Sequence, residues 1–398
     1  MSVSCVSPTK WRAGYGRDLV KTALRQPHGS PRLSELARRS RNAVIVTCDK
    51  TRGVPSHITI PSVLDELRAG GMELDRVRVL IATGLHKDET MNDVKERLGG
   101  ELMDRIRISI HSSDDQDQLV FLGRLSSGVP LYLNKEVAES DLVVVEGTVE
   151  PHFFAGFTGG SKIILPGATG TETISGNHCS KNIDDSRSRY GVLKNPIRMD
   201  ADEAIRYLKN TFSLNLVLDS KKRIVLATAG HIIDSFRIAA RQVAVHSRVR
   251  IKSRPDVVIT TNGGYPLDRN IYQCVKGIAV PEQVLHPGSK IIMIGECTDG
   301  VGGMEFEELV ASNLPSVVYE RLRQSGSAIP AQWEAQVLSR ILSRNPVWFV
   351  TRSELRSKIQ SMHMHYAETI EEAVDSAEIS EGDHVLAVTD GPSSILTL

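Results

Sequence analysis

Residues 42–49 read NAVIVTCD and residues 76–84 read RVRVLIATG. Both runs are short, apolar and rich in β-branched residues, so each predicts a buried strand. Between them, apolar residues recur at helical spacing from Ile58 to Leu67. A strand, a helix and another strand in this order indicate α/β layers with a largely parallel sheet.

The same order of short strands and longer helices continues along the chain. Further strands are predicted at residues 106–111, 130–134, 141–147 and 223–230, with a helix at about 231–246. A second series begins near residue 255, with strands predicted at 256–264, 289–296, 346–351 and 384–388 and helices at about 267–284 and over much of 305–343.

The length of the chain, 398 residues, exceeds what one ordinary core accommodates. We therefore predict two α/β domains with mostly parallel sheets, residues 1–253 and 254–398. The basic stretch 248–254 (RVRIKSR) is the predicted connector, read as a solvated segment. The prediction allows the last residues of the chain to pack back on the first domain.

Composition excludes several classes of partner. The 48 basic and 48 acidic residues cancel, so neither a nucleic acid nor an anionic membrane surface is indicated. No apolar run has the length of a membrane-spanning helix, and residues 1–17 lack the apolar core of a signal peptide, so we expect a cytoplasmic location. The five cysteines are scattered and form no CxxC pair, which argues against a disulfide framework and a zinc knuckle.

Polar residues gather where predicted strands end. Asp49 and Arg52 follow one strand, His86 follows another, the segment 150–162 follows a third, and Asn262 ends a strand of the second domain. In open α/β sheets, ligands bind beyond the carboxyl ends of the strands. Four such clusters predict one active-site cleft between the two domains.

The densest segment, residues 150–178, reads EPHFFAGFTGGSKIILPGATGTETISGNH. Its glycines allow the backbone to approach a ligand closely, which suggests a phosphate loop. The Walker A pattern fails, however, because Lys162 is preceded by Ser161 and followed by Ile163. A dinucleotide fingerprint fails as well, since no GxGxxG follows the first strand.

Taken by themselves, these residues leave several readings open. His152 and His178 fit metal ligands, acid/base groups or hydrogen-bonded structural histidines, and the presence of several histidines at or near strand-end loops favours a functional role. Lys162 precedes an apolar run, and a desolvated lysine with a lowered pKa is a nucleophile suited to covalent attachment. Packing or structural roles are the expectation for Phe153, Phe154, Phe157, His111 and Cys274.

Taken together, the motifs resemble those of the nickel-dependent lactate racemases and their 2-hydroxy acid racemase and epimerase relatives. The shared pieces are, in chain order, DKTR at 49–52, ATGLH at 82–86, EPHFFAGFTGGSK at 150–162, NH at 177–178 and NGGYPLDRNIYQCVKG at 262–277. The resemblance spans most of the chain, and the pieces are specific as an ordered set.

The resemblance implies a nickel pincer cofactor, nickel pyridinium-3-thioamide-5-thiocarboxylic acid mononucleotide, held covalently by Lys162. His178 matches the protein ligand of the nickel, and His86 and His152 match an acid/base pair. Asp49 matches a motif carboxylate required at the cofactor site. The positions that match residues around the substrate are Arg52, Tyr272, Gln273, Lys276 and, in AQWEAQ, Trp333.

The implied reaction is inversion of C2 in a 2-hydroxy carboxylate such as lactate, through a 2-keto acid. Removing the C2 hydrogen as a proton would place a carbanion beside a carboxylate, whereas its removal as hydride avoids that charge. The hydroxyl proton must leave at the same time, and histidine is a base of suitable pKa. Inversion from either face calls for two such bases, and Arg52 and Lys276 suit the substrate carboxylate.

Two positions depart from the family pattern and keep the substrate open. Gly53 stands where proline commonly follows the motif arginine, and Ser161 stands where arginine often precedes the lysine. Two other functions are compatible with the pattern: an oxidoreductase that uses the same hydride chemistry, and a non-catalytic binding protein of the same fold. The resemblance also implies accessory cofactor-building enzymes as partners. It leaves the oligomeric state undetermined.

Overall fold

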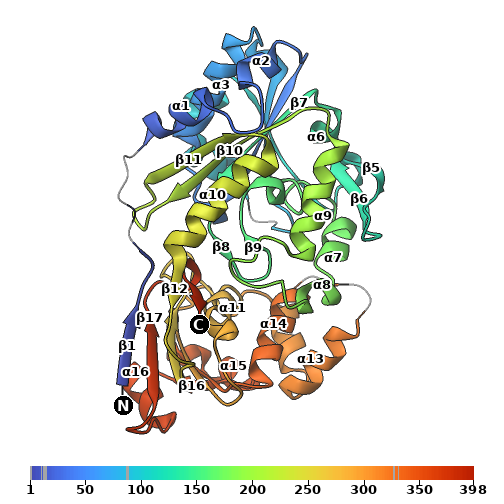
Figure 1. The fold of residues 1–398 in the computed structure, drawn as a ribbon. Helices are drawn as coiled ribbons and strands as arrows, with labels where there is room; N and C mark the ends of the chain where they lie inside the picture. The colour runs from blue at the N-terminus through green and yellow to red at the C-terminus, as the bar shows by residue number, and fades with distance from the viewer. Residues whose placement is uncertain (1, 10, 12–15, 87–88, 326–327, 330) are drawn as a thin grey trace.

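The computed structural model describes residues 2–9, 11, 16–86, 89–325, 328–329 and 331–398 (Figure 1). Within these ranges the chain forms two α/β halves, each built around a six-stranded sheet. The predicted α/β class with mostly parallel sheets is confirmed.

The first sheet has the strand order β11-β10-β7-β2-β3-β4. Its strands are β2 (Ala43–Cys48), β3 (Val77–Ala82), β4 (Arg107–Ile110), β7 (Leu142–Thr148), β10 (Thr211–Leu218) and β11 (Ile224–Gly230). All neighbouring pairs are parallel except β10 and β11, which are antiparallel. β2, β3 and β7 are therefore central and covered on both faces, which is why they read as continuous apolar runs.

Alternate side chains of β2 serve two different cores. Ile45 packs in the core covered by the helices nearest the N-terminus, whereas Val44 and Val46 pack on the opposite face with Ile163 and Ile164. The helices of this half are α1 (Arg17–Arg25), α2 (Leu33–Ala37), α3 (Ser56–Ala69), α4 (Met91–Leu98), α5 (Gly100–Met103), α6 (Lys135–Glu139), α7 (Thr171–Asn177), α8 (Ser180–Asp184), α9 (Pro196–Ala204) and α10 (Ile232–Ser247). Two small hairpins join β5 (Leu119–Arg124) with β6 (Pro130–Asn134) and β8 (Pro151–His152) with β9 (Gly156–Phe157).

The second sheet has the strand order β1-β17-β13-β14-β15-β16, and all its pairs are parallel. Its strands are β1 (Ser2–Val6), β13 (Val257–Thr261), β14 (Lys290–Ile294), β15 (Val347–Val350), β16 (His365–Ala367) and β17 (His384–Val388). Its helices are α11 (Ile271–Ala279), α12 (Met304–Ala311), α13 (Pro315–Arg323), α14 (Gln332–Leu342), α15 (Arg356–Ser361) and α16 (Ile370–Ser376). Residues of α11 and α14 share one large core with β13 and β14.

The connections between the halves correct two sequence predictions. Residues 2–6, assigned to the first domain with everything up to 253, pair instead with β17 of the second sheet. The segment 248–254 is also not wholly a solvated connector, because β12 (Arg248–Arg250) pairs with β18 (Ile395–Thr397) and Val249 is buried. Ile395 packs among Phe157 and Phe236, so the end of the chain lies against the first half.

α10 extends from the first sheet toward β12, as Figure 1 shows, and so carries the chain from one half to the other. Among the described residues, no helix is long and apolar enough to cross a membrane.

Candidate active site

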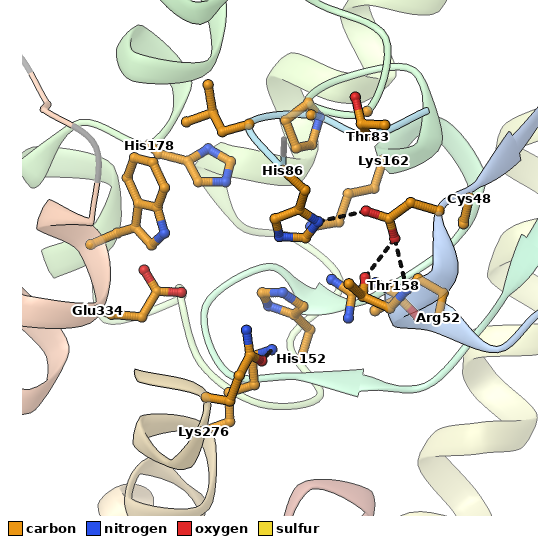
Figure 2. A pocket seen from close by; sticks show the side chains of 18 of the residues that line it. Cys48, Arg52, Thr83, His86, His152, Thr158, Lys162, His178, Lys276 and Glu334 are labelled. Atoms are coloured by element: carbon orange, nitrogen blue, oxygen red, sulfur yellow. Dashed lines mark hydrogen bonds and ion pairs between the residues drawn. The ribbon is translucent and has the colours of Figure 1, made fainter. Parts of the chain in front are cut away.

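A cavity of about 650 Å³ lies between the two halves of the molecule. Loops that follow strands of the first sheet form one side, and residues of α11 and α14 form the other. All ten side chains singled out from the sequence line this cavity: Asp49, Arg52, His86, His152, Lys162, His178, Tyr272, Gln273, Lys276 and Trp333. Figure 2 labels Arg52, His86, His152, Lys162, His178 and Lys276. The interdomain cleft predicted from the strand ends is therefore present.

Asp49 follows β2 and caps the short 3-10 turn Lys50–Arg52. Its Oδ1 accepts hydrogen bonds from the backbone N of Thr51 at 3.1 Å and from the Thr51 hydroxyl at 2.6 Å. Its Oδ2 lies 2.6 Å from Nδ1 of His86. Burial would raise the pKa of Asp49, but the hydrogen bonds from His86 and Thr51 outweigh it and lower this pKa to about 2.

An ionised Asp49 determines which nitrogen of His86 carries the hydrogen between them. A carboxylate only accepts hydrogen bonds, so Nδ1 of His86 must carry this hydrogen. In the tautomer that this contact selects, Nε2 is the acceptor nitrogen. The turn that places His86 after β3 uses Gly84 at a φ of +57°, with its N donating to the carbonyl of Gly167 at 2.9 Å.

His152 ends the first strand of the β8–β9 hairpin and is buried. Its Nδ1 accepts hydrogen bonds from the backbone N of Ala155 at 3.2 Å and of Phe154 at 3.4 Å. Burial, together with the charges of Lys162 and other nearby cations, holds the pKa of His152 well below its usual value. The ring is therefore neutral with its hydrogen on Nε2, the opposite arrangement from His86.

The loop that carries Lys162 depends on two glycines in left-handed conformations. A Cβ at Gly159 (φ +80°) would lie 2.8 Å from the carbonyl oxygen of Thr148, and one at Gly160 (φ +58°) would lie 2.7 Å from the Phe236 ring. Larger residues at either position would force the loop away from the sheet.

A buried arginine, Arg198, holds the same loop from behind. It donates to the carbonyl of Phe157 and, at 2.8 Å, to the carbonyl of Gly159, and its guanidinium lies 4.2 Å from the centre of the Phe236 ring. Ser161, the residue that departs from the family pattern, donates to Asp202 at 2.6 Å. The serine is therefore part of the network that supports the loop.

Lys162 is a desolvated amine at the cavity wall. Burial, followed by the charges of Arg52, Arg198 and Lys276, lowers its pKa well below the usual value. A neutral lysine amine is a nucleophile, so this environment suits covalent attachment of a ligand.

His178 follows α7 and presents one ring nitrogen to the cavity. Its Nδ1 lies 2.9 Å from Oδ1 of Asn177, whose amide nitrogen donates to Asp200 at 3.0 Å. Because that amide nitrogen is committed to Asp200, the Asn177 oxygen faces His178 and accepts its Nδ1–H. Burial and the charge of Lys162 lower the pKa of His178 to about 3, so its Nε2 is a free donor for a metal ion.

The second half contributes α11, which Asn270 caps by accepting from the backbone N of Gln273 at 2.9 Å. Lys276 hydrogen-bonds the side-chain oxygen of Gln273, as the three-residue spacing predicts. Burial and the charge of Arg52 lower the pKa of Lys276 to about 8. Arg52 and Lys276 therefore bring two cationic side chains to one cavity from opposite halves (Figure 2).

Some cavity residues escaped the sequence analysis. Glu334 and Thr83 line it, and Phe153 and Phe154, predicted to be packing residues, both pack in the core and form part of the wall. Both phenylalanines directly follow His152 in the EPHFF motif, and this position was a signal that they line the same cavity. His111, expected to be structural, lies 3.0 Å from the carbonyl of Thr169 through Nε2 and 3.1 Å from the Asn134 amide through Nδ1.

Among the described residues, no group of three or more His, Cys, Asp or Glu side chains is arranged to hold a metal ion. Within the cavity, His178 offers an imidazole nitrogen, a donor that suits nickel.

Comparisons with known proteins agree with this arrangement. Residues 4–191 match the lactate racemase N-terminal domain, and residues 251–396 match the lactate racemase C-terminal domain. Over 385 residues the chain is 41% identical to the lactate racemase of Thermoanaerobacterium thermosaccharolyticum, covering 95% of this chain and 90% of that protein. It is 38% identical over 385 residues to the lactate racemase of Lactiplantibacillus plantarum, covering 94% of this chain and 89% of that one.

Solved structures give the same result. The lactate racemase apoprotein from T. thermosaccharolyticum superposes with a TM-score of 0.93 at 39% identity, over 98% of this chain and 95% of that one. A Thermotoga maritima protein superposes with a TM-score of 0.71 at 16% identity, over 98% and 100% of the two chains, and shares the fold. The chain therefore belongs to the lactate racemase family of isomerases.

Proposed function

We propose that this protein inverts the C2 centre of a 2-hydroxy carboxylate, lactate or a related acid, by proton-coupled hydride transfer through a 2-keto acid. The proposed cofactor is the nickel pincer nucleotide, bound covalently to Lys162. The observation that supports this most directly is the convergence in one cavity of a desolvated lysine, a free imidazole donor, two further histidines and two cations.

The residues present fit the cofactor. The neutral amine of Lys162 is suited to form the covalent bond, and Nε2 of His178 is suited to bind the nickel. The Asn177 oxygen fixes the tautomer of His178, the usual task of a residue behind a metal ligand. When bound, the cofactor would supply the hydride acceptor that the chain itself lacks.

Arg52 and Lys276 would bind the substrate carboxylate from the two sides of the cleft. This holds C2 in one place while its substituents change, which is the positioning that a racemase needs.

His86 is the better-prepared base. Its Nε2 is free to take the hydroxyl proton, and the ionised Asp49 behind it stabilises the imidazolium that results. His152 presents Nε2–H and so donates to the substrate oxygen in the state described. To accept a proton there, it must first move its hydrogen to Nδ1, and the N–H groups of Phe154 and Ala155 must turn away.

The test uses protein produced together with the accessory enzymes that build the cofactor. Intact-protein mass should increase by the mass of the cofactor, with about one nickel per chain as the pincer stoichiometry requires. Lys162→Ala should remove the covalent mass, and loaded wild type should racemise a 2-hydroxy acid. Unmodified, nickel-free wild type from a host shown to make the cofactor would refute the assignment, as would racemase activity without the accessory enzymes.

A further inference from the structure

Glu334 contributes a carboxyl group to the cavity wall, and the proposed reaction does not use this group. It lies in the first turn of α14, is only 4% exposed, and follows Trp333. In Figure 2 its carboxyl points into the space that His178, His152 and Lys276 surround. It therefore faces the same space as the groups proposed to bind and convert the substrate.

Three neighbouring side chains act on the carboxyl group of Glu334. Tyr272, Lys276 and Trp333 each favour its ionised form and so oppose the effect of burial on its pKa. Its Oε2 is buried and has no hydrogen-bond partner among the described residues. Since buried polar atoms in proteins are almost always paired, an unpaired oxygen in a side chain that lines a cavity points to a ligand as the missing partner.

We infer that Glu334 is a specificity-determining residue whose free oxygen accepts a hydrogen bond from a second hydroxyl on the substrate, beyond C2. The favoured substrates would then be 2-hydroxy acids with a further hydroxyl, of which 2,3-dihydroxypropanoate (glycerate) is the smallest. This inference rests on the proposed racemase function and narrows its substrate class.

The chemistry of the alternatives supports a hydroxyl. A methyl group, as in lactate, would leave the oxygen unpaired, and a second substrate carboxylate would meet a like charge whenever Glu334 is ionised. Burial raises the pKa of Glu334 to about 7, against the hydrogen bond from Tyr272 and the charge of Lys276. The neutral acid retains a carbonyl lone pair, so the group can accept a hydrogen bond in either state.

The test compares two substrates that differ by one oxygen, glycerate and lactate, on cofactor-loaded protein. Wild type should favour glycerate in kcat/KM by about 10-fold or more, in line with the cost of leaving one buried acceptor unpaired. Glu334→Met should lower that ratio by about 10-fold, mainly through slower glycerate turnover. Glu334→Gln, which keeps an acceptor oxygen and removes the charge, should retain most of the preference.

Glu305→Gln is the matched control, because it removes the same charge from an exposed carboxylate at the rim of the same cavity. It should leave the ratio unchanged. Binding gives a second readout by calorimetry with racemic acids, which show no net reaction heat in a racemase. Glu334→Met should weaken glycerate binding and leave lactate binding the same or tighter.

The outcomes separate this inference from the proposed function. Equal losses for glycerate and lactate in Glu334→Met would overturn the inference, because they would assign Glu334 to the part of the molecule that both acids share. A lactate preference in wild type would overturn it as well. If loaded wild type, with correct mass and nickel content, racemises neither these nor other 2-hydroxy acids, the proposed function itself fails.

Discussion

Nδ1 of His86 lies 2.6 Å from Oδ2 of Asp49, although the two residues follow different strands, β3 and β2. Parallel pairing of these strands, with Cys48 opposite Ala82, brings their ends together. The carboxylate is almost wholly shielded, whereas 42% of the His86 side chain is exposed. The pair thus combines a buried carboxylate, which orients the ring, with an imidazole that is open to the cavity.

The first prediction concerns this pair. Asp49→Asn should lower kcat/KM by about 10²–10⁴-fold, the usual contribution of an oriented general base. An amide no longer stabilises the imidazolium and can donate to Nδ1, which would move the hydrogen of His86 to Nε2. Steady-state racemisation by Asp49→Asn, with cofactor loading checked by mass, measures this. Activity within twofold of wild type, at full loading, would remove Asp49 from the mechanism.

The second prediction concerns the protonation states of two histidines. In the cofactor-free protein, His152 should be neutral with its hydrogen on Nε2, and His178 should be neutral with its hydrogen on Nδ1. His178 should remain so until the pH approaches about 3. Two-bond ¹⁵N–¹H correlation spectra of histidine-labelled protein report these tautomers, with His152→Gln and His178→Gln assigning the signals. A ring hydrogen on Nδ1 of His152 would contradict the described hairpin geometry.

The third prediction concerns the pH dependence of stability. The pKa of Lys162 in the folded chain lies well below its value of about 10.4 in the unfolded chain. At any pH between these two pKa values, the unfolded chain therefore binds one more proton than the folded chain. The contribution of Lys162 to the free energy of unfolding is therefore lowest at low pH, and it rises as the pH approaches about 10.4.

Lys162→Met removes this titration, so the variant should be more stable than wild type at pH 7. The difference should narrow toward pH 10, by up to about 1.4 kcal/mol per pH unit. Differential scanning calorimetry of the apoproteins at several pH values tests this. Lys252→Met, which replaces an exposed lysine, should show no such trend. A constant difference between pH 7 and pH 10 would mean that Lys162 stays charged in the folded chain.

The fourth prediction concerns the loop support. Arg198→Lys should destabilise the fold by about 2–4 kcal/mol and reduce the fraction of chains that acquire the cofactor. A lysine keeps the charge but cannot donate to the carbonyls of Phe157 and Gly159 with one planar group.

Urea unfolding and intact mass provide the two measurements for Arg198→Lys. Arg237→Lys serves as the control, because Arg237 is half exposed and pairs with Asp202 at 3.8 Å rather than with the carbonyls of Phe157 and Gly159. Normal loading of a destabilised Arg198→Lys would restrict Arg198 to a role in stability.

Much of the architecture was predictable because it depends on local patterns. The apolar runs at 42–49, 76–84 and 141–147 are central strands covered on both faces, and such strands carry their burial in their own composition. β10 went unpredicted because Ser213 and Asn215 interrupt its apolar run. Their partner is Ser235 of α10, whose hydroxyl lies 2.7 Å from that of Ser213 and 3.1 Å from the Asn215 amide nitrogen.

Long-range pairing was the part that local patterns could not show. β1 is short and Val3 is exposed, so its sequence carries little sign of burial. Its partner, β17, lies almost a chain length away, and only the closure of the second sheet brings the two strands together. The same applies to β12, whose partner β18 is the last strand of the chain.

The amino-acid sequence alone specified the α/β class and ten of the side chains that line the cleft, because motif order and strand-end position are properties of the chain itself. Tertiary structure alone decided the states of these groups. His86 and His152 carry their hydrogens on different nitrogens because one faces a carboxylate and the other faces backbone N–H groups. Glu334 became part of the cavity in the same way: burial and an unpaired oxygen depend on neighbours that only the folded chain supplies.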